Sequence, residues 1–327
     1  KGRVVLEPVT LDKIKNVPVV ESYLPAQLTS KGPIGIVSDI QGSLQDLKVN
    51  TSIMADESDV GFGNWLKKPK GVPAKIVVRI AHKNDRTTLD QSTLSLYNLN
   101  MDVSGSMEKS PERLLRLRVR TDAVKLDGWD KLLPRVSNYE LKGEAGFNLA
   151  INTMQSPQGD NVDIRGLLSL NKVSIKDRKT GRRVDQIASK VIFKGKEAEV
   201  EKLQIKLGSS NFTVQGVLEN FSSPMFRYRL SSSKVNLADL TQRPEYKSDW
   251  AKGITSEGEL RLADGTPTVE AEITLAEGSL QELPYKNLNG IIAWRPDKLG
   301  IEDLNFQALG GDFQGNGSWT LGNGKNP

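Results

Sequence analysis

Apolar and polar residues alternate along most of the chain. Within 34–40, isoleucines alternate with small or polar residues, and within 115–120 Leu, Leu and Val alternate with three arginines. A period of two places successive side chains on opposite faces of a strand, so the pattern predicts half-buried β-strands. Gly, Pro, Asn and Asp interrupt the alternation, and turns need these residues. We therefore expect a mostly β fold of mainly antiparallel strands, with hairpin tips at 83–86 and 177–181.

One spacing of apolar and glycine positions recurs three times. The copies read Leu94, Leu96, Met101, Val103, Gly105; Ile205, Leu207, Phe212, Val214, Gly216; and Phe306, Ala308, Phe313, Gly315, Gly317. Each copy predicts two alternating strands around a short turn. From Val124 to Val235 is 111 positions, and from Gly105 to Gly216 is also 111. A shared offset indicates a repeated unit, and stacked repeats bury their apolar faces against their neighbours.

A second short sequence motif accompanies the repeat, and we use it to place the boundaries of the repeat units. A Val-x-Leu triplet starts at Val9, Val124 and Val235, and each opens a short stretch with helical character at 11–24, 128–133 and 237–250. Proline interrupts or ends each stretch, as it does helices. We place the repeat units at 1–123, 124–234 and 235–327, in one continuous array with short helices between units.

The apolar faces of such strands can lie in one of two environments. They can pack on another layer as a dry core, which is the commoner outcome for alternating strands, or they can line an open trough. Aromatic residues make up only 6% of the chain, which leaves few large side chains to fill a thick core. The aliphatic positions repeat over the whole length, as a long lining requires. We expect an elongated, curved β-groove, or half-pipe, with the dry core as the alternative.

Four stretches resemble the AsmA family of bacterial envelope proteins. They are 32–42, 61–65, 203–216 and 234–240, and their motifs are structural and degenerate. The resemblance implies a periplasmic protein with a repeating β-groove, held to the inner membrane by an N-terminal helix, and a non-enzymatic role in carrying phospholipid between the inner and outer membranes. The chain starts at Lys1 and lacks that anchor, so we expect a fragment of a longer protein.

The hypothesis names two sets of residues. The residues expected to line the groove for acyl chains occupy equivalent positions of the three copies: Leu94, Leu96, Met101, Val103, Ile205, Leu207, Phe212, Val214, Phe306 and Phe313. The residues expected to attract anionic head groups are basic and lie on one strand face and one hairpin: Arg116, Arg118, Arg120, Arg178, Lys179, Arg182 and Arg183. Each basic side chain near an anionic membrane adds about 1 kcal/mol. A solvated surface is the alternative for these residues.

Composition narrows the classes of partner. The net charge is +5 with few aromatic residues, which does not favour nucleic acid, since bases stack on aromatic side chains. The chain has no cysteine, so thiolate metal sites and disulfides are excluded. The expected partners are a phospholipid or another acyl-chain lipid, the two membrane surfaces and an envelope protein.

Candidate catalytic residues are few. His82 is the only histidine, and it lies at a strand end beside Lys83. The acidic pairs Asp56–Glu57 and Glu257–Glu259 lie in turns or on polar strand faces. We expect no enzyme, no metal and no cofactor. A hydrolytic enzyme remains the distant alternative.

A second functional hypothesis keeps the same sheet but assigns it another role. An assembly factor for the outer membrane would pair partner strands at the sheet edges. An inward Asp would then leave function intact and a proline at the edge would abolish it, whereas the lipid hypothesis expects the reverse.

Overall fold

The computed structural model describes residues 1–15, 24–43, 45–109, 113–156, 159–221, 223–241, 243–263 and 266–320. The chain is 75% strand and 6% helix, and its strands pair antiparallel, which confirms the predicted fold class. The residues group into two compact units. Unit 1 holds 1–169 and 173–182, and unit 2 holds 170–172 and 183–327. The three repeat units remain a prediction.

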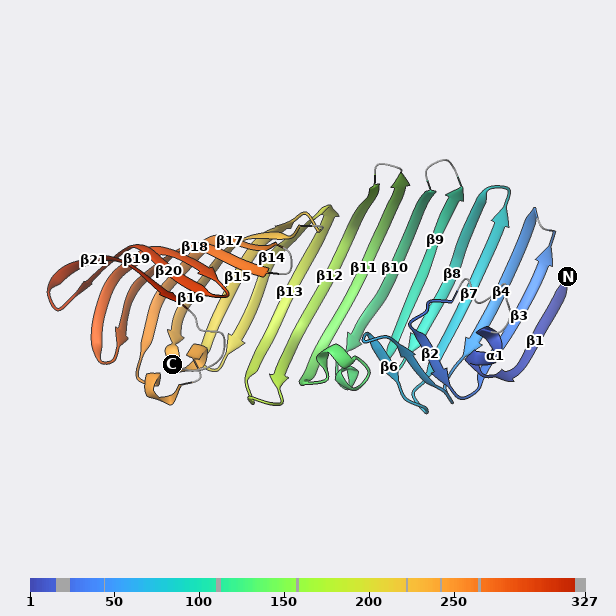
Figure 1. The fold of residues 1–327 in the computed structure, drawn as a ribbon, viewed down its shortest axis with the longest axis horizontal. Coiled ribbons are helices and arrows are strands. Elements are labelled where there is room, and N and C mark those ends of the chain that lie inside the picture. The colour runs from blue at the N-terminus through green and yellow to red at the C-terminus, as the bar shows by residue number, and fades with distance from the viewer. Residues whose placement is uncertain are drawn as a thin grey trace. The chain divides into compact units, whose positions relative to one another are not determined.

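Unit 1 is built on one ladder of neighbouring strands (Figure 1). β3 and β4 pair, β4 pairs with β7, and β7 to β11 then follow in sequence order, while β1 lies on the other side of β3. The elements are β1 (Gly2–Val9), α1 (Leu11–Lys15), β2 (Leu28–Lys31), β3 (Ile34–Gly42), β4 (Asp46–Met54), β5 (Asp59–Phe62), β6 (Leu66–Lys68), β7 (Ala74–Lys83), β8 (Arg86–Leu96), β9 (Leu99–Lys109), β10 (Arg113–Lys125), η1 (Trp129–Lys131), η2 (Pro134–Val136) and β11 (Tyr139–Ser156). β12 (Gly159–Asp177) has residues in both units.

Unit 2 is a meander in which each strand pairs with the next. The ladder runs from β13 to β21 without a crossover (Figure 1). The elements are β13 (Arg183–Gly195), β14 (Glu197–Leu207), β15 (Ser210–Glu219), β16 (Met225–Asn236), α3 (Leu237–Thr241), η3 (Pro244–Tyr246), β17 (Trp250–Ala263), β18 (Thr266–Leu280), β19 (Leu283–Arg295), β20 (Lys298–Ala308) and β21 (Gly311–Thr320).

The repeated glycines have a common structural setting. Gly105, Gly216 and Gly317 each pair with the last regular residue before an irregularity in the preceding strand, namely Leu89, Val200 and Ile301. A Cβ on Gly105 would lie 2.2 Å from the carbonyl oxygen of Arg116 on the next strand, and one on Gly216 would lie 2.3 Å from that of Arg227. A bulge bends its strand locally, and only glycine fits where the neighbouring backbone comes this close. The repeated spacing of these glycines therefore corresponds to a strand irregularity that recurs in the fold.

The short helices form where the Val-x-Leu mark predicts them. α1 begins at Leu11, and residues 16–23 of the predicted stretch lie outside the described part. The second stretch is a 3₁₀ turn, η1, followed by η2 with Pro134 at its first position. The third is α3 followed by η3. In the second and third stretches a proline stands at the start of the last turn, where its missing N–H is tolerated.

The core of unit 2 is small and lies beside its helical segment. Val235, Ala251 and Ile254 are buried together, and Phe212, Leu230 and Leu275 pack against them. Buried apolar residues of unit 1 likewise belong to the starts of its helical segments and to the strand ends near them: Leu11, Ile34, Leu96, Val124 and Leu132. The clustered buried residues of unit 2 therefore lie at the helical end of its strands, while Ala198 and Ala271 are buried farther from that end.

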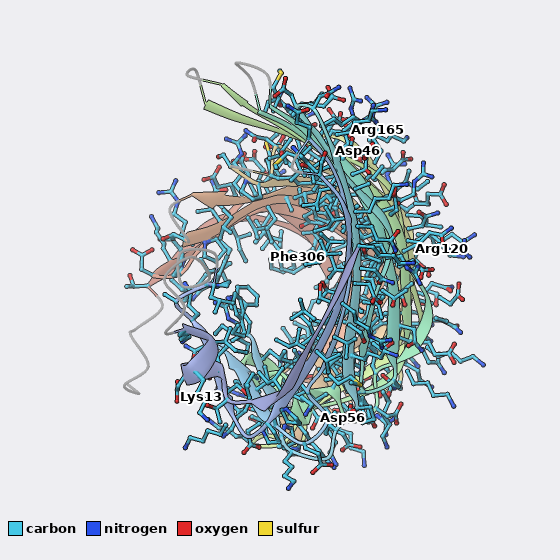
Figure 2. The ribbon with its side chains drawn as sticks, turned by 90° about the vertical axis from the view of Figure 1, so that its right-hand side faces the viewer. Lys13, Asp46, Asp56, Arg120, Arg165 and Phe306 are labelled. Carbon is cyan, nitrogen blue, oxygen red and sulfur yellow. The ribbon has the colours of Figure 1, made fainter. Side chains whose placement is uncertain are left out.

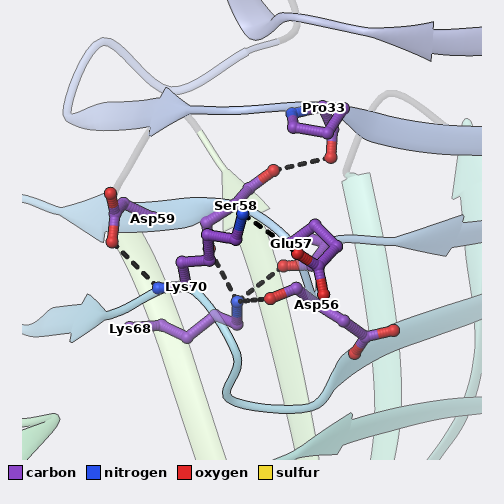
Figure 3. Close-up of polar contacts among 8 residues, drawn as sticks. Pro33, Asp56, Glu57, Ser58, Asp59, Lys68 and Lys70 are labelled. Carbon is purple, nitrogen blue, oxygen red and sulfur yellow. Dashed lines mark hydrogen bonds and ion pairs between the residues drawn. The ribbon is translucent and has the colours of Figure 1, made fainter.

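A second, three-stranded sheet of β2, β5 and β6 belongs to unit 1 and is fixed by a buried ammonium group (Figure 3). Lys68 is 1% exposed, and its Nζ donates hydrogen bonds to the carbonyl oxygens of Ala55 at 2.6 Å, Asp56 at 3.1 Å and Ser58 at 2.7 Å. Ser58 is itself fully buried and donates to the carbonyl of Pro33 at 2.6 Å. Burial lowers the pKa of Lys68 although three carboxylates lie nearby.

Candidate functional site: the inner faces of the two units

The strands of each unit bend so that one face is concave (Figure 2). In unit 2, Phe306 points to the concave side, and in unit 1, Arg120 points away from it (Figure 2). Directly paired residues of an antiparallel ladder share a face, so the registers assign the remaining side chains. We call the concave side of each unit its inner face and the opposite side its outer face.

The ladder of unit 1 places the predicted lining residues on its inner face. Leu94 pairs with Met101, and Met101 pairs with Thr121 of β10, whose neighbour Arg120 is on the outer face. Leu96 shares the side of Leu94, and Val103 shares that of Met101, because residues two apart on a strand point the same way. All four predicted residues of unit 1 are therefore on one face.

The same holds in unit 2. Ile205 pairs with Phe212, and Val214 pairs with Leu203. Phe306 pairs with Phe313, and their rings stack with centroids 5.1 Å apart and planes 11° from parallel. Leu207 shares the side of Ile205. The predicted residues of unit 2 thus lie on its inner face, and their contact with lipid stays a prediction.

Exposure divides the predicted residues into two groups. Leu96, Leu207 and Val214 are buried, while Phe313 is 42% exposed and the others are intermediate. The sequence missed a further set of apolar side chains that lie on the inner faces and are exposed: Ile76, Met107, Leu260, Leu262 and Trp319. Parts of each inner face are therefore apolar and open to solvent. The alternation of residues 260 and 262 with Arg261 was the signal that could have found this set.

The outer faces are charged. In unit 2, Arg229 lies 2.7 Å from Glu257, and Arg227 lies 3.1 Å from Glu259. The hydrogen bond from Arg261 is the main cause that lowers the pKa of Glu259. The lining of a shallow hollow on this face includes these arginines and glutamates. Exposed ion pairs of this kind add little stability, but they keep this side of the sheet solvated.

The basic residues predicted to meet head groups divide by their contacts. Arg116 and Arg120 are exposed and lie near Glu108 and Asp122, at 4.0 and 3.4 Å. Arg118 is exposed on the same outer face. None of these three points toward the apolar inner face, because their strand neighbours Leu117 and Val119 do.

The hairpin between β12 and β13 holds the other four. Arg178 donates to Asp130 and to the carbonyl of Ser137, each at 2.5 Å, and Asp130 is only 3% exposed. Arg178 therefore anchors the turn to η1 and η2. Arg183 pairs with Asp185 at 2.6 Å, while Lys179 and Arg182 are exposed in the turn. Lys179 and Arg182 remain the most available members of this predicted set.

The candidate catalytic residues have structural partners. His82 Nδ1 lies 2.9 Å from the hydroxyl of Thr87 across the β7–β8 hairpin. Asp56 accepts the backbone N–H of Ala74 at 2.6 Å, and Glu57 pairs with Lys70 at 3.2 Å. Among the described residues, no group of three or more His, Cys, Asp or Glu side chains could hold a metal ion.

A carboxylate that the sequence did not single out fixes the β14–β15 turn in unit 2. Asp239 of α3 accepts hydrogen bonds from the backbone N–H and hydroxyl of Ser209, at 2.9 and 2.8 Å, and from the hydroxyl of Ser210 at 2.8 Å. Partial burial alone would raise the pKa of Asp239, but the hydrogen bonds from the two serines outweigh it and lower the pKa. The contact ties the helical segment to a hairpin tip.

No helix in the described part of the chain is both long and apolar enough to cross a membrane. Comparison with protein-family models, with curated proteins and with solved structures found no match for this chain.

Proposed function

We propose that the chain binds the acyl chains of phospholipid or a similar lipid on the inner faces of its units, as a non-enzymatic segment of a lipid carrier of the bacterial envelope. The observation that carries the proposal is the apolar, solvent-exposed part of each inner face, typified by Leu260 and Leu262 at 38% and 39% exposure. The periplasmic location and the transfer between inner and outer membranes come from the resemblance to the AsmA family and are part of the same proposal.

The energetics favour an acyl chain as the occupant. Burying one CH₂ group is worth about 0.8 kcal/mol, so a chain of ~16 carbons gains about 10 kcal/mol before the costs of binding. Paired aliphatic side chains such as Leu260 and Val269 offer contact without a polar group to satisfy. A lining of this kind binds hydrocarbon without specifying one head group.

The charge of the outer face supports binding of acyl chains on the inner face. Arg227, Arg229, Glu257 and Glu259 alternate with the inner residues of β16 and β17. Burying these groups against hydrocarbon would cost several kcal/mol for each charge. Acyl chains are therefore expected on the inner face only.

The test is native mass spectrometry of the purified chain, followed by extraction and identification of bound lipid after incubation with phospholipid vesicles. Leu260→Asp and Leu262→Asp place a charge on the open part of the inner face, away from the clustered buried residues of unit 2, and are expected to reduce bound lipid at least tenfold. Leu240→Asp is the matched control, because Leu240 is similarly exposed at 41% but lies on α3. A folded chain that carries no lipid, or equal loss in all three variants, would contradict the proposal.

A further inference from the structure

Three segments of unit 1 that are far apart in the sequence meet at the end of its strands where η1 and η2 lie (Figure 1). The backbone N–H of Lys67 in β6 donates to the carbonyl oxygen of Leu132 at 2.7 Å. In the turn after β12, the backbone N–H of Arg178 donates to the carbonyl oxygen of Asn138 at 2.9 Å. β6, the segment of η1 and η2, and this turn are therefore neighbours on the surface of unit 1.

The three segments together are strongly basic. Residues 65–67, 127–139 and 176–182 contain seven lysines and arginines but only three aspartates. Two of these carboxylates are used within the structure, since Asp130 is buried against Arg178, and Asp177 accepts the backbone N–H of Lys179 at 2.7 Å. Four exposed basic side chains form no ion pair among the described residues: Lys131, Arg135, Lys179 and Arg182.

The fold does not require all of this basic charge. The turn between β18 and β19 holds the corresponding place in unit 2, because it also follows the second strand after a helical segment. That turn consists of Gln281 and Glu282, and the backbone N–H of Gln281 donates to the buried Asp249 at 2.9 Å. A backbone donor thus makes in unit 2 the contact to a buried carboxylate that Arg178 makes in unit 1. The other cations of residues 176–182 are not needed to hold the turn.

Two exposed aromatic side chains lie among these cations. Trp65 is 57% exposed, and the guanidinium of Arg135 lies over its ring, 3.5 Å from the ring centroid. Tyr139 is 39% exposed and directly follows Asn138, which binds the turn. Trp and Tyr are enriched at membrane–water interfaces, because a ring with an apolar body and a polar edge fits the level of the head groups. A guanidinium that stacks on a ring keeps its N–H groups free for phosphate oxygens.

We propose that this surface docks unit 1 on an anionic phospholipid membrane. Its members, which we call the basic rim, are Trp65, Lys131, Arg135, Tyr139, Lys179 and Arg182. The cations meet the phosphates of the head groups, and the two rings enter the interface beside them. Single-stranded nucleic acid also combines basic and aromatic contacts, but its bases stack on uncovered ring faces, and Arg135 covers one face of Trp65. The inference adds a membrane contact to the proposed function and does not depend on acyl chains being bound on the inner face.

Sedimentation of the purified chain with phospholipid vesicles tests the basic rim. The chain is expected to bind vesicles of equal parts phosphatidylglycerol and phosphatidylcholine, and to be released from them by about 1 M salt, at which charges are screened within about 3 Å. Each basic side chain near an anionic surface strengthens binding about fivefold, so Lys179→Gln combined with Arg182→Gln should weaken it about 30-fold. Trp65→Ala should weaken it about tenfold, because it removes the largest ring of the rim.

Arg116→Gln combined with Arg118→Gln is the matched control, because it removes the same charge from the outer face of β10. This variant should bind the anionic vesicles nearly as well as the unmodified chain. Equal weakening in the two double variants would overturn the proposal, since the overall charge would then account for the attraction. So would unchanged binding of Trp65→Ala, or tighter binding of the chain to a single-stranded oligonucleotide than to the anionic vesicles.

Leu260→Asp keeps this test separate from the test of acyl binding. Leu260 lies in unit 2, and its replacement leaves the basic rim intact. The variant is therefore expected to sediment with anionic vesicles as the unmodified chain does, although it carries less lipid in the mass-spectrometry test. Loss of vesicle binding in Leu260→Asp would overturn the proposal, because the inner face would then hold the membrane in place of the basic rim.

Discussion

Replacing Lys68 by methionine tests how much one buried cation stabilises the small sheet of unit 1. Methionine keeps most of the length and volume of the side chain but removes the three hydrogen bonds to Ala55, Asp56 and Ser58. Hydrogen bonds to a charged group are worth about 1.5–3 kcal/mol each, and an unpaired buried carbonyl costs about 1–3 kcal/mol. The variant no longer has to bury a charged ammonium group, and this gain offsets several kcal/mol of the lost hydrogen bonding.

We expect the variant to lower the free energy of local opening by about 3 kcal/mol, which raises the opening equilibrium constant roughly 150-fold. The assay is hydrogen exchange of the amides that hold the loop closed, those of Ala55, Ser58 and Gly71, which donate to backbone carbonyls at 2.9, 3.2 and 2.8 Å. Lys67→Met is the matched control, because Lys67 is the preceding residue of β6 and is exposed.

The comparison of the two variants decides the matter. Exchange of these amides should accelerate in Lys68→Met and stay near the unmodified rate in Lys67→Met. Equal rates in the two variants would refute the reasoning, since burial and the three carbonyl contacts would then contribute nothing beyond those of an exposed lysine.

Three further predictions concern other contacts. Asp239→Asn should lower the free energy of unfolding by about 1 kcal/mol at neutral pH. Because the folded state lowers the pKa of Asp239, this difference from the unmodified chain should shrink as the pH falls below 3.8 and through the pKa of the folded state. Denaturant unfolding at several pH values measures the difference. Arg178→Met should destabilise the β12–β13 turn by about 2 kcal/mol by leaving the buried Asp130 unpaired, with recovery when Asp130→Asn is added, as hydrogen exchange of the turn amides would show. Gly105→Ala should lower the melting temperature by an amount equivalent to about 1–3 kcal/mol, while Gly315→Ala, which meets no neighbour, should not.

The alternation of apolar residues was sufficient to predict the strands and the face that each residue shares. Residues such as Ile205 and Phe212 pair as their spacing implies, because the period of a strand is fixed by backbone geometry. The helical stretches were predicted in place but not in type or length: the segment after Gly128 forms a 3₁₀ turn, since Pro134 limits the run.

The buried polar contacts could not be read from the sequence. Lys68 looks like an ordinary lysine in a basic run, and only the fold brings the carbonyls of Ala55, Asp56 and Ser58 around it. The same is true of Asp130 and Arg178, which are 48 positions apart. Local patterns carry no information about partners that meet through the return of distant strands.

The meander order has a consequence for how the chain is made. From β7 to β11 and from β13 to β21, each strand pairs with the one synthesised just before it. Contacts between sequence neighbours close short loops, which is the topology associated with fast folding. Each newly made strand can thus be added to a ladder that already exists, so within a unit the fold can grow in the direction of synthesis instead of waiting for the last residue.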